Sequence, residues 1–334
     1  MTSTPSSPGR PTLAEALAAG GGPVILDGGL ATELERAGFD LGDDLWSARL
    51  LLTEPDAVRA AHRRFLDAGA QVVTTASYQA SFEGFRAAGI DEAGVRELLQ
   101  RSVRLAREAA DGEPGRWVAA SVGPYGAMLA GGQEYTGSYA VPQGVPRAGR
   151  PGAGTLDVAA LAAWHRPRLE LLAEAGADVL ACETVPAAAE AEALLAEVAR
   201  LGLPAWLSLT TVTATDGTVR TRLGEPVEPV FALAATVPQI IAIGVNCTDP
   251  AGVTAAVQVA ARAAPGKAVV VYPNSGETWD GAQRRWQGAP GFAPGLVPEW
   301  IEAGARLVGG CCRIGPADLR PLTVIMQSQP ERRC

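Results

Sequence analysis

Three of the five cysteines in this 334-residue chain are placed where they could bind one metal ion. Cys311 and Cys312 are adjacent in the stretch ARLVGGCCRIGP, and Cys247 ends the run IIAIGVNC. Zn²⁺ binds cysteine thiolates in a tetrahedral array, and a site with three protein ligands keeps a fourth position open for a reactant. Cys182 and Cys334 have no partner in this arrangement. The spacing is therefore compatible with a catalytic zinc site.

Adjacent cysteines need a special backbone to reach one ion. In an extended strand neighbouring side chains point to opposite faces, so Cys311 and Cys312 could not share a ligand there. The preceding Gly309–Gly310 pair allows the chain to leave strand geometry, because glycine tolerates conformations that other residues avoid. Two alternatives stay open: the thiols could be small buried residues, or Cys311 and Cys312 could form a vicinal disulfide.

Eight apolar runs predict the strands that would position these residues. The phrase AGAQVV and its relatives AGADVL and AGARLV each link a helical pattern to such a run, as expected of stacked β/α units. Eight parallel strands in one domain predict a single-domain α/β protein with a (β/α)₈ TIM-type barrel, and a doubly wound open sheet is the alternative. The predicted strands cover residues 24–28, 71–76, 117–122, 178–183, 205–210, 240–246, 268–273 and 306–310.

Polar residues recur where the predicted strands end. In a barrel these ends form the catalytic face, so the residues are candidates for a site there, although strand-end hydrogen bonding explains any one of them equally well. Two long Gly- and Pro-rich stretches, 123–154 and 273–295, would lie on the same rim as covering loops. The strand-end candidates are Asp27, Thr75, Glu183, Ser208 and Asn246.

The composition excludes several classes of protein. A net charge of −8 provides no basic field for nucleic acid or an anionic membrane surface. No apolar run approaches the roughly 18 residues of a membrane-spanning helix. Residues 1–12, rich in Ser, Thr and Pro, predict a disordered tail, followed by one domain over 13–330. An odd number of scattered cysteines argues against a secreted disulfide framework, so we expect a cytoplasmic protein with small-molecule partners.

Common catalytic groups are scarce in the sequence. The only histidines, His62 and His165, fall inside helical patterns, and no GxSxG motif is present, so a Ser-His-Asp hydrolase is disfavoured. The single lysine, Lys267, precedes the seventh predicted strand, which disfavours a Schiff-base aldolase. A metal that ionises its own bound nucleophile would need no histidine base.

Six motifs in the chain resemble those of the homocysteine S-methyltransferases. The likeness is greatest to the stand-alone branch that uses S-methylmethionine or S-adenosylmethionine, and the separated GVNC and GGCC motifs are highly specific. The motifs are ILDGGLATELERAG (25–38), TTASYQAS (74–81), CETVP (182–186), GVNC (244–247), YPNSGE (272–277) and GGCCRIGP (309–316), and together they span nearly the whole chain after the tail.

This resemblance implies a (β/α)₈ barrel that binds Zn²⁺ through Cys247, Cys311 and Cys312. The implied reaction is methyl transfer from a sulfonium donor to the homocysteine thiol, giving methionine. Asp27 and Glu183 match family positions that bind the homocysteine amino group, which needs anionic partners.

Further substrate contacts are expected around these residues. Trp46 and Tyr78 are candidates for the wall that faces the cationic donor, because cations are attracted to aromatic ring faces. Thr75, Ser208 and Asn246 are additional substrate-binding candidates, and hydrogen bonding at the strand ends is their alternative role.

Two departures from relatives bear on the donor. Thr184 follows Glu183 where the betaine-using branch has tyrosine or phenylalanine, and the sequence after CCRIGP is too short for a cobalamin or folate module. Both favour a sulfonium over betaine or methylcobalamin.

Betaine-homocysteine and selenocysteine methyltransferases are the neighbouring alternatives. A non-catalytic metal or thiol-redox module is an alternative of another class, and it predicts a reversible Cys311–Cys312 disulfide. The sequence does not fix the oligomeric state.

Overall fold

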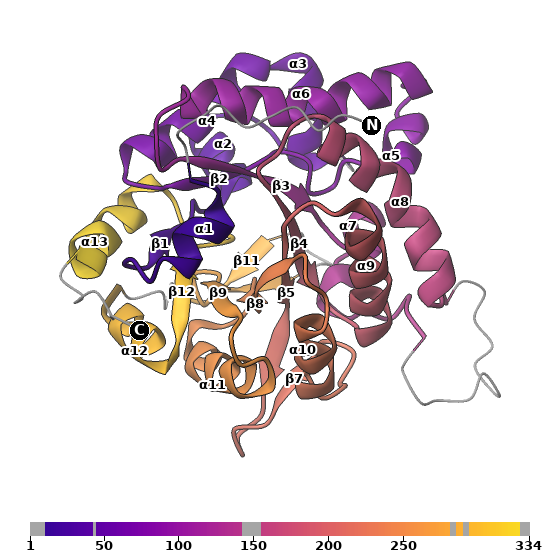
Figure 1. Ribbon diagram of the computed structural model, residues 1–334. Helices are drawn as coiled ribbons and strands as arrows, with labels where there is room; N and C mark the ends of the chain where they lie inside the picture. The colour runs from indigo at the N-terminus through magenta and orange to yellow at the C-terminus, as the bar shows by residue number, and fades with distance from the viewer. Residues whose placement is uncertain (1–10, 43–44, 142–154, 281–284, 290–293, 328–334) are drawn as a thin grey trace.

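Eight parallel strands form the central sheet of the computed structural model (Figure 1). The structure describes residues 11–42, 45–141, 155–280, 285–289 and 294–327. Each predicted run overlaps one of these strands, which confirms the (β/α)₈ barrel and excludes the open sheet. In pairing order the strands are β1 (Val24–Ile25), β12 (Ala305–Val308), β9 (Ala268–Tyr272), β8 (Ile240–Asn246), β5 (Ala205–Leu209), β4 (Val179–Val185), β3 (Trp117–Val122) and β2 (Val72–Thr74).

Backbone hydrogen bonds between the first two strands close the sheet into a barrel. Leu26, just after β1, forms an isolated parallel bridge with Val72 of β2. The Asp27 amide donates to the Val72 carbonyl at 3.0 Å, and the Gln71 amide donates to the Ile25 carbonyl at 2.8 Å. Because closure leaves no free sheet edge, all eight strand ends meet around one opening.

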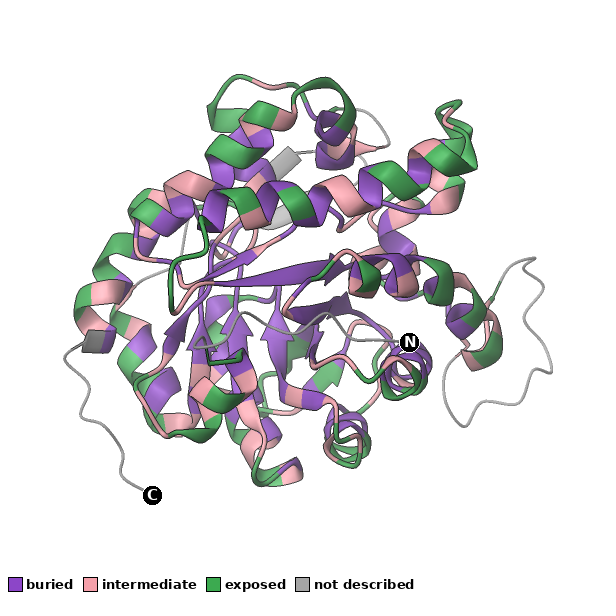
Figure 2. Ribbon diagram, turned by 45° about the horizontal axis from the view of Figure 1, so that its top comes forward, coloured by how far each residue is buried: buried purple, intermediate pink, exposed green. Residues whose placement is uncertain are grey.

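Alternating strand residues divide the core into two layers. One set fills the barrel interior, and Leu13 of α1 (Leu13–Ala18) packs with it. The other set faces the surrounding helices. Figure 2 shows the consequence: the strands are buried along their length, whereas the helices are buried on one side and exposed on the other. The interior set includes Val72, Trp117, Ala119, Val179, Ala181, Trp206, Ala242, Val270, Tyr272 and Leu307.

Helices surround the barrel between the strands. The glycines of the three recurring joints, Gly69, Gly176 and Gly304, all have positive φ (106°, 85° and 127°), which lets the chain turn sharply from a helix into the next strand. The helices after α1 are α2 (Leu30–Arg36), α3 (Leu50–Thr53), α4 (Pro55–Asp67), α5 (Phe82–Ala87), α6 (Glu92–Ala110), α7 (Tyr125–Met128), α8 (Val158–Glu174), α9 (Ala188–Leu201), α10 (Glu228–Ala235), α11 (Val253–Ala263), α12 (Val297–Ala303) and α13 (Pro316–Gln327).

The two long stretches predicted as irregular loops contain short elements. Helix α7 and the 3₁₀ helix η2 (Gln133–Tyr135) lie in the first, and the hairpin β10 (Thr278–Asp280) and β11 (Arg285–Gln287) lies in the second. A second hairpin joins β6 (Thr211–Thr213) to β7 (Val219–Thr221), and the remaining 3₁₀ helices are η1 (Trp46–Arg49), η3 (Pro250–Gly252) and η4 (Pro294–Leu296). Residues 142–154, much of the predicted tail (1–10) and Cys334 lie outside the described residues.

None of the helices in the described ranges combines the length and apolarity that crossing a membrane requires.

Candidate active site

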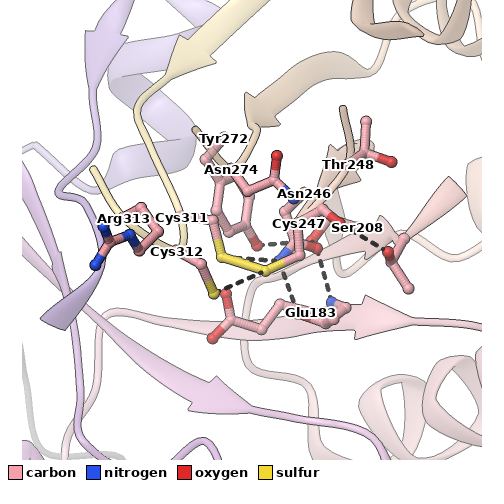
Figure 3. Close-up of a disulfide and its surroundings, with 12 residues drawn as sticks. Glu183, Ser208, Asn246, Cys247, Thr248, Tyr272, Asn274, Cys311, Cys312 and Arg313 are labelled. Atoms are coloured by element: carbon pink, nitrogen blue, oxygen red, sulfur yellow. Dashed lines mark hydrogen bonds between the residues drawn. A yellow bond between two sulfur atoms is a disulfide. The ribbon is translucent and has the colours of Figure 1, made fainter. Parts of the chain in front are cut away.

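The three cysteines of the GVNC and GGCC motifs meet at the carboxyl ends of β8 and β12 (Figure 3). Their sulfur atoms all lie within 4.8 Å of one another. Cys247 and Cys311 form a disulfide, and the Cys312 sulfur lies 3.6 Å from that of Cys247. The adjacent cysteines therefore do not pair with each other as a vicinal disulfide would require. Cys182 is buried elsewhere in the core.

The glycines before the cysteines act by close packing and not by an unusual φ angle. Neither Gly309 nor Gly310 has positive φ, so the expectation that they would adopt conformations closed to other residues is wrong. A Cβ on Gly309 would lie 2.6 Å from the Asp27 carbonyl oxygen, and one on Gly310 would lie 2.2 Å from a methyl carbon of Ile314. The left-handed φ angles belong to Cys247 (46°) and to Arg313, the residue after the pair (70°).

Replacing Gly309 by alanine should therefore destabilise the barrel where β12 meets β1. Because the new methyl group would press on backbone, which cannot rotate away, we expect a loss of about 1–3 kcal/mol in the free energy of unfolding, as for other overpacked sites. Urea unfolding measures this loss. Gly22→Ala is the matched control, since a Cβ there has no atom within 4 Å. Equal stability of the two variants would contradict the packing argument.

A cavity of about 510 Å³ opens beside the sulfur atoms. It is lined by residues at the ends of β1, β2, β4, β8, β9 and β12, the face where barrel enzymes place their sites. Asp27, Glu183, Thr75, Trp46 and Tyr78 contribute to its wall along with the three cysteines. Most of the residues proposed from the sequence therefore surround one space.

Asp27 and Glu183 are buried carboxylates that line this cavity. Asp27 accepts hydrogen bonds from the Thr74 amide (2.7 Å) and the Thr74 hydroxyl (2.9 Å), and Glu183 accepts one from the Ser121 hydroxyl. Burial raises the pKa of Asp27 to about 8 and that of Glu183 to about 7, against the lowering effect of these hydrogen bonds. A cationic ligand between them would restore their ionisation.

Aromatic side chains form another part of the wall. The rings of Trp46 and Tyr78 meet edge to face, with centroids 6.4 Å apart. Trp46 has a left-handed φ of 50°, a conformation that costs about 1–2 kcal/mol and recurs at binding sites. The Tyr135 hydroxyl lies 3.9 Å from the sulfur atoms of both Cys247 and Cys312. Tyr139, from the same loop, instead donates to buried Glu190.

Ser208 and Asn246 lie behind the wall and not on it. The Ser208 hydroxyl is within 2.7 Å of the Asn246 side-chain oxygen and within 2.6 Å of the Tyr272 hydroxyl. Asn246 also accepts from the Thr184 amide at 2.7 Å, and its amide nitrogen lies 3.9 Å from the Cys311 sulfur. These contacts hold Thr184 in its left-handed conformation (φ 58°) and support the cysteines. Neither side chain is placed to touch a substrate directly.

Thr75 lines the cavity, but its hydroxyl is committed to the protein. It is 2.7 Å from the Ser77 hydroxyl and accepts from the Ser121 amide at 3.0 Å. The hydroxyls of Ser121 and Tyr272 hydrogen-bond Glu183 and lower its pKa. The sequence analysis did not identify these two residues, because both lie within predicted strands. It also missed Glu134 on η2, for which no strand periodicity gave a signal.

In the described part of the chain, the cavity wall carries acidic side chains with no basic side chain to balance them. Among the described residues that line it there is no lysine, arginine or histidine. Such a wall favours cationic ligands, and it disfavours substrates whose charge is wholly negative. Its acidic residues are Asp27, Glu35, Asp40, Glu134 and Glu183.

The sulfur cluster fits a thiophilic metal ion once its disulfide is reduced. Reduction by two electrons and two protons would give three thiols in contact, with no His, Asp or Glu of the described residues completing a fourth position. Burial raises the pKa of the Cys312 thiol to about 12, so its thiolate needs a neighbouring positive charge. A bound metal cation would supply that charge.

Comparison with known proteins gives the same family. The homocysteine S-methyltransferase family model matches residues 24–325. The chain is 43% identical over 314 residues to the homocysteine S-methyltransferase of Escherichia coli K12, covering 90% of this chain and 94% of that protein. It is 38% identical over 318 residues to the homocysteine S-methyltransferase YbgG of Bacillus subtilis 168, covering 91% and 95%.

Solved structures extend this similarity to the fold. The crystal structure of the homocysteine methyltransferase MmuM from Escherichia coli in its metallated form has a TM-score of 0.77 at 40% identity, over 93% of this chain and 98% of that one. The oxidized form of MmuM has a TM-score of 0.75 at 41% identity, over 91% and 96%. The chain therefore belongs to the homocysteine S-methyltransferase family and is a methyltransferase.

Proposed function

We propose that the protein is a zinc-dependent homocysteine S-methyltransferase. It transfers a methyl group from a sulfonium donor, S-methylmethionine or S-adenosylmethionine, to homocysteine, and the product is methionine. The observation that carries this proposal is the meeting of three cysteine sulfurs and two buried carboxylates in one cavity.

Cys247, Cys311 and Cys312 would hold the metal in the reduced protein. Two sulfurs of a tetrahedral zinc site lie about 3.8 Å apart, given a Zn–S distance of about 2.3 Å. The 3.6 Å separation of the Cys247 and Cys312 sulfurs is close to that value. When bound, Zn²⁺ supplies an open coordination position and deprotonates a thiol that occupies it.

Asp27 and Glu183 would orient the acceptor. The homocysteine ammonium group is a cation, and it would pair with both carboxylates and keep them ionised. Asp27 follows β1 and Glu183 lies in β4, and the cysteines follow β8 and β12, so the ammonium group and the thiol of homocysteine would be held by side chains from different strands of one rim. Fixing both ends of the acceptor lowers the entropic cost of the transfer.

The transfer itself is a displacement at carbon. The homocysteine sulfur, having lost its proton to solvent, donates an electron pair to the methyl carbon. The bond from that carbon to the donor sulfur breaks, and the donor sulfur keeps the electron pair as a neutral thioether. Trp46 and Tyr78 would border the cationic donor, as ring faces attract sulfonium groups.

A donor panel tests this proposal. We expect the reduced, zinc-loaded protein to form methionine from homocysteine with S-methylmethionine or S-adenosylmethionine and to be inactive with betaine. Methionine is quantified by mass spectrometry with a methyl-labelled donor. Transfer from betaine with neither sulfonium active would refute the donor assignment, and replacing homocysteine by selenocysteine identifies the preferred acceptor.

A further inference from the structure

Glu134 is a carboxylate on the cavity wall with one oxygen that no described residue binds. Its Oε2 atom is buried and makes no hydrogen bond with any described residue. It lies on η2, a short helix that closes with a hydrogen bond from the Tyr135 amide to the Gly132 carbonyl at 3.0 Å. Burial raises the pKa of Glu134 to about 7. A buried carboxylate oxygen without a hydrogen-bond partner is costly, so its retention here needs a physical reason.

The neighbours of Glu134 place it beside the sulfur cluster. Glu134 lines the same cavity as Tyr78 and Cys312, and the hydroxyl of Tyr135, the next residue, lies 3.9 Å from the Cys312 sulfur. The short helix η2 therefore places Glu134 on the cavity wall, next in sequence to the residue whose hydroxyl approaches the sulfur cluster. Unlike Oε2 of Glu134, the carboxylates of Asp27 and Glu183 accept hydrogen bonds from Thr74 and Ser121, respectively.

No basic side chain of the described residues neutralises Glu134 from within the cavity. The guanidinium of Arg222 lies 5.6 Å from the Tyr135 ring centroid, but it donates to the Thr210 hydroxyl (3.1 Å) and to the Cys247 carbonyl (3.3 Å). The loop that carries Glu134 is also anchored, because buried Glu190 accepts from the Tyr125 amide and from the Tyr139 hydroxyl. The loop is thus held in place with Glu134 on the cavity wall.

We propose that Glu134 binds the positively charged sulfonium group of the methyl donor. The inference rests on the proposed function, and it follows from the position of the carboxylate. The methyl group that is transferred must lie next to the thiol of homocysteine, and hence near the cysteines, so the sulfonium sulfur lies one bond further away. Glu134 lines this cavity together with Tyr78 and Cys312, and the Trp46 and Tyr78 rings provide the rest of a cation-binding wall.

This role predicts a specific kinetic signature. The sulfonium charge disappears as the methyl group leaves, so a carboxylate beside it stabilises the bound donor more than the transition state. Replacing Glu134 by glutamine should therefore raise KM for S-methylmethionine by about tenfold or more, as expected for loss of a partly buried charge pair. The turnover number should be unchanged or higher, and KM for homocysteine unchanged.

The experiment measures these constants for the zinc-loaded wild-type protein, Glu134→Gln, Glu134→Asp and Ser138→Ala. Ser138 lies exposed on the same loop and serves as the matched control. Glu134→Asp keeps the charge and should recover part of the donor affinity. Inhibition by 2-amino-5-methylhexanoate, in which a neutral CH replaces the sulfonium S⁺ of S-methylmethionine, should be equal in wild type and Glu134→Gln.

Three results would overturn the inference. A donor KM of Glu134→Gln equal to that of the wild type would show that the carboxylate does not bind the donor. An equal loss of affinity for the neutral analogue would show that it binds the amino group instead. A fall in turnover and in zinc content together would show a structural role. If the wild-type protein makes no methionine from either sulfonium, the proposed function fails, and the inference fails with it.

Discussion

Replacing Cys311 by alanine is expected to remove the bound zinc and to abolish methionine formation. Loss of a residue that merely supports a metal ligand typically costs 10–100-fold in metal affinity or activity, so loss of the ligand itself should cost more than about 100-fold. Cys311 lies within the sulfur cluster, because its sulfur is bonded to that of Cys247 and lies 3.9 Å from the Asn246 amide nitrogen. The measurements are zinc per chain by elemental analysis and the rate of methionine formation, both on reduced protein.

Cys182→Ala provides the control for this experiment. Cys182 is also buried, but it lies outside the sulfur cluster. We expect this variant to keep its zinc and its turnover with only a small loss of stability. A Cys311→Ala protein that retains zinc and wild-type activity would contradict the assignment of the metal site.

Replacing Glu183 by glutamine is expected to weaken homocysteine binding, with KM for homocysteine rising by about 10–100-fold. A hydrogen bond to a charged group contributes about 1.5–3 kcal/mol, and glutamine keeps the shape and the acceptor for Ser121 while removing the charge. KM for the donor should change much less. Steady-state kinetics with each substrate varied in turn measures both constants, and an unchanged homocysteine KM would refute the acceptor assignment.

The same carboxylates predict a pH dependence. With pKa values of about 8 for Asp27 and about 7 for Glu183, both groups become protonated and neutral as the pH falls. kcat/KM for homocysteine should therefore fall as the pH is lowered from about 8 to about 6. In Glu183→Gln this fall should be smaller, because one of the two titrating carboxyl groups is absent. Because folding raises the pKa of both carboxyl groups, the free energy of unfolding of the substrate-free protein should fall as the pH rises through these pKa values.

The sequence predicted the barrel well because its strands are buried on both faces. Runs such as residues 117–122 are wholly buried in the structure and show no helical periodicity. The recurring glycine joints added independent support, and all three have positive φ. Helix α1 and the two hairpins were not expected, since short elements have weak local signals.

The candidate site was only partly predictable, because the sequence does not show how deep in the barrel each polar side chain lies. The position of a polar residue near a strand end places it close to the catalytic face but does not show whether its side chain reaches the cavity. Ser208 and Asn246 lie one layer below the wall and bond each other, whereas Glu183 reaches it. Glu134 lies in a loop, where contacts depend on the folded chain and not on any repeat in the sequence.

The most direct test of the account is the zinc content of freshly purified, reduced protein measured together with its activity. We predict one zinc per chain, loss of methionine formation when a strong chelator removes it, and recovery when zinc is restored. Full turnover by protein from which elemental analysis finds no metal would contradict the central claim that three cysteines hold a zinc ion that activates the acceptor thiol.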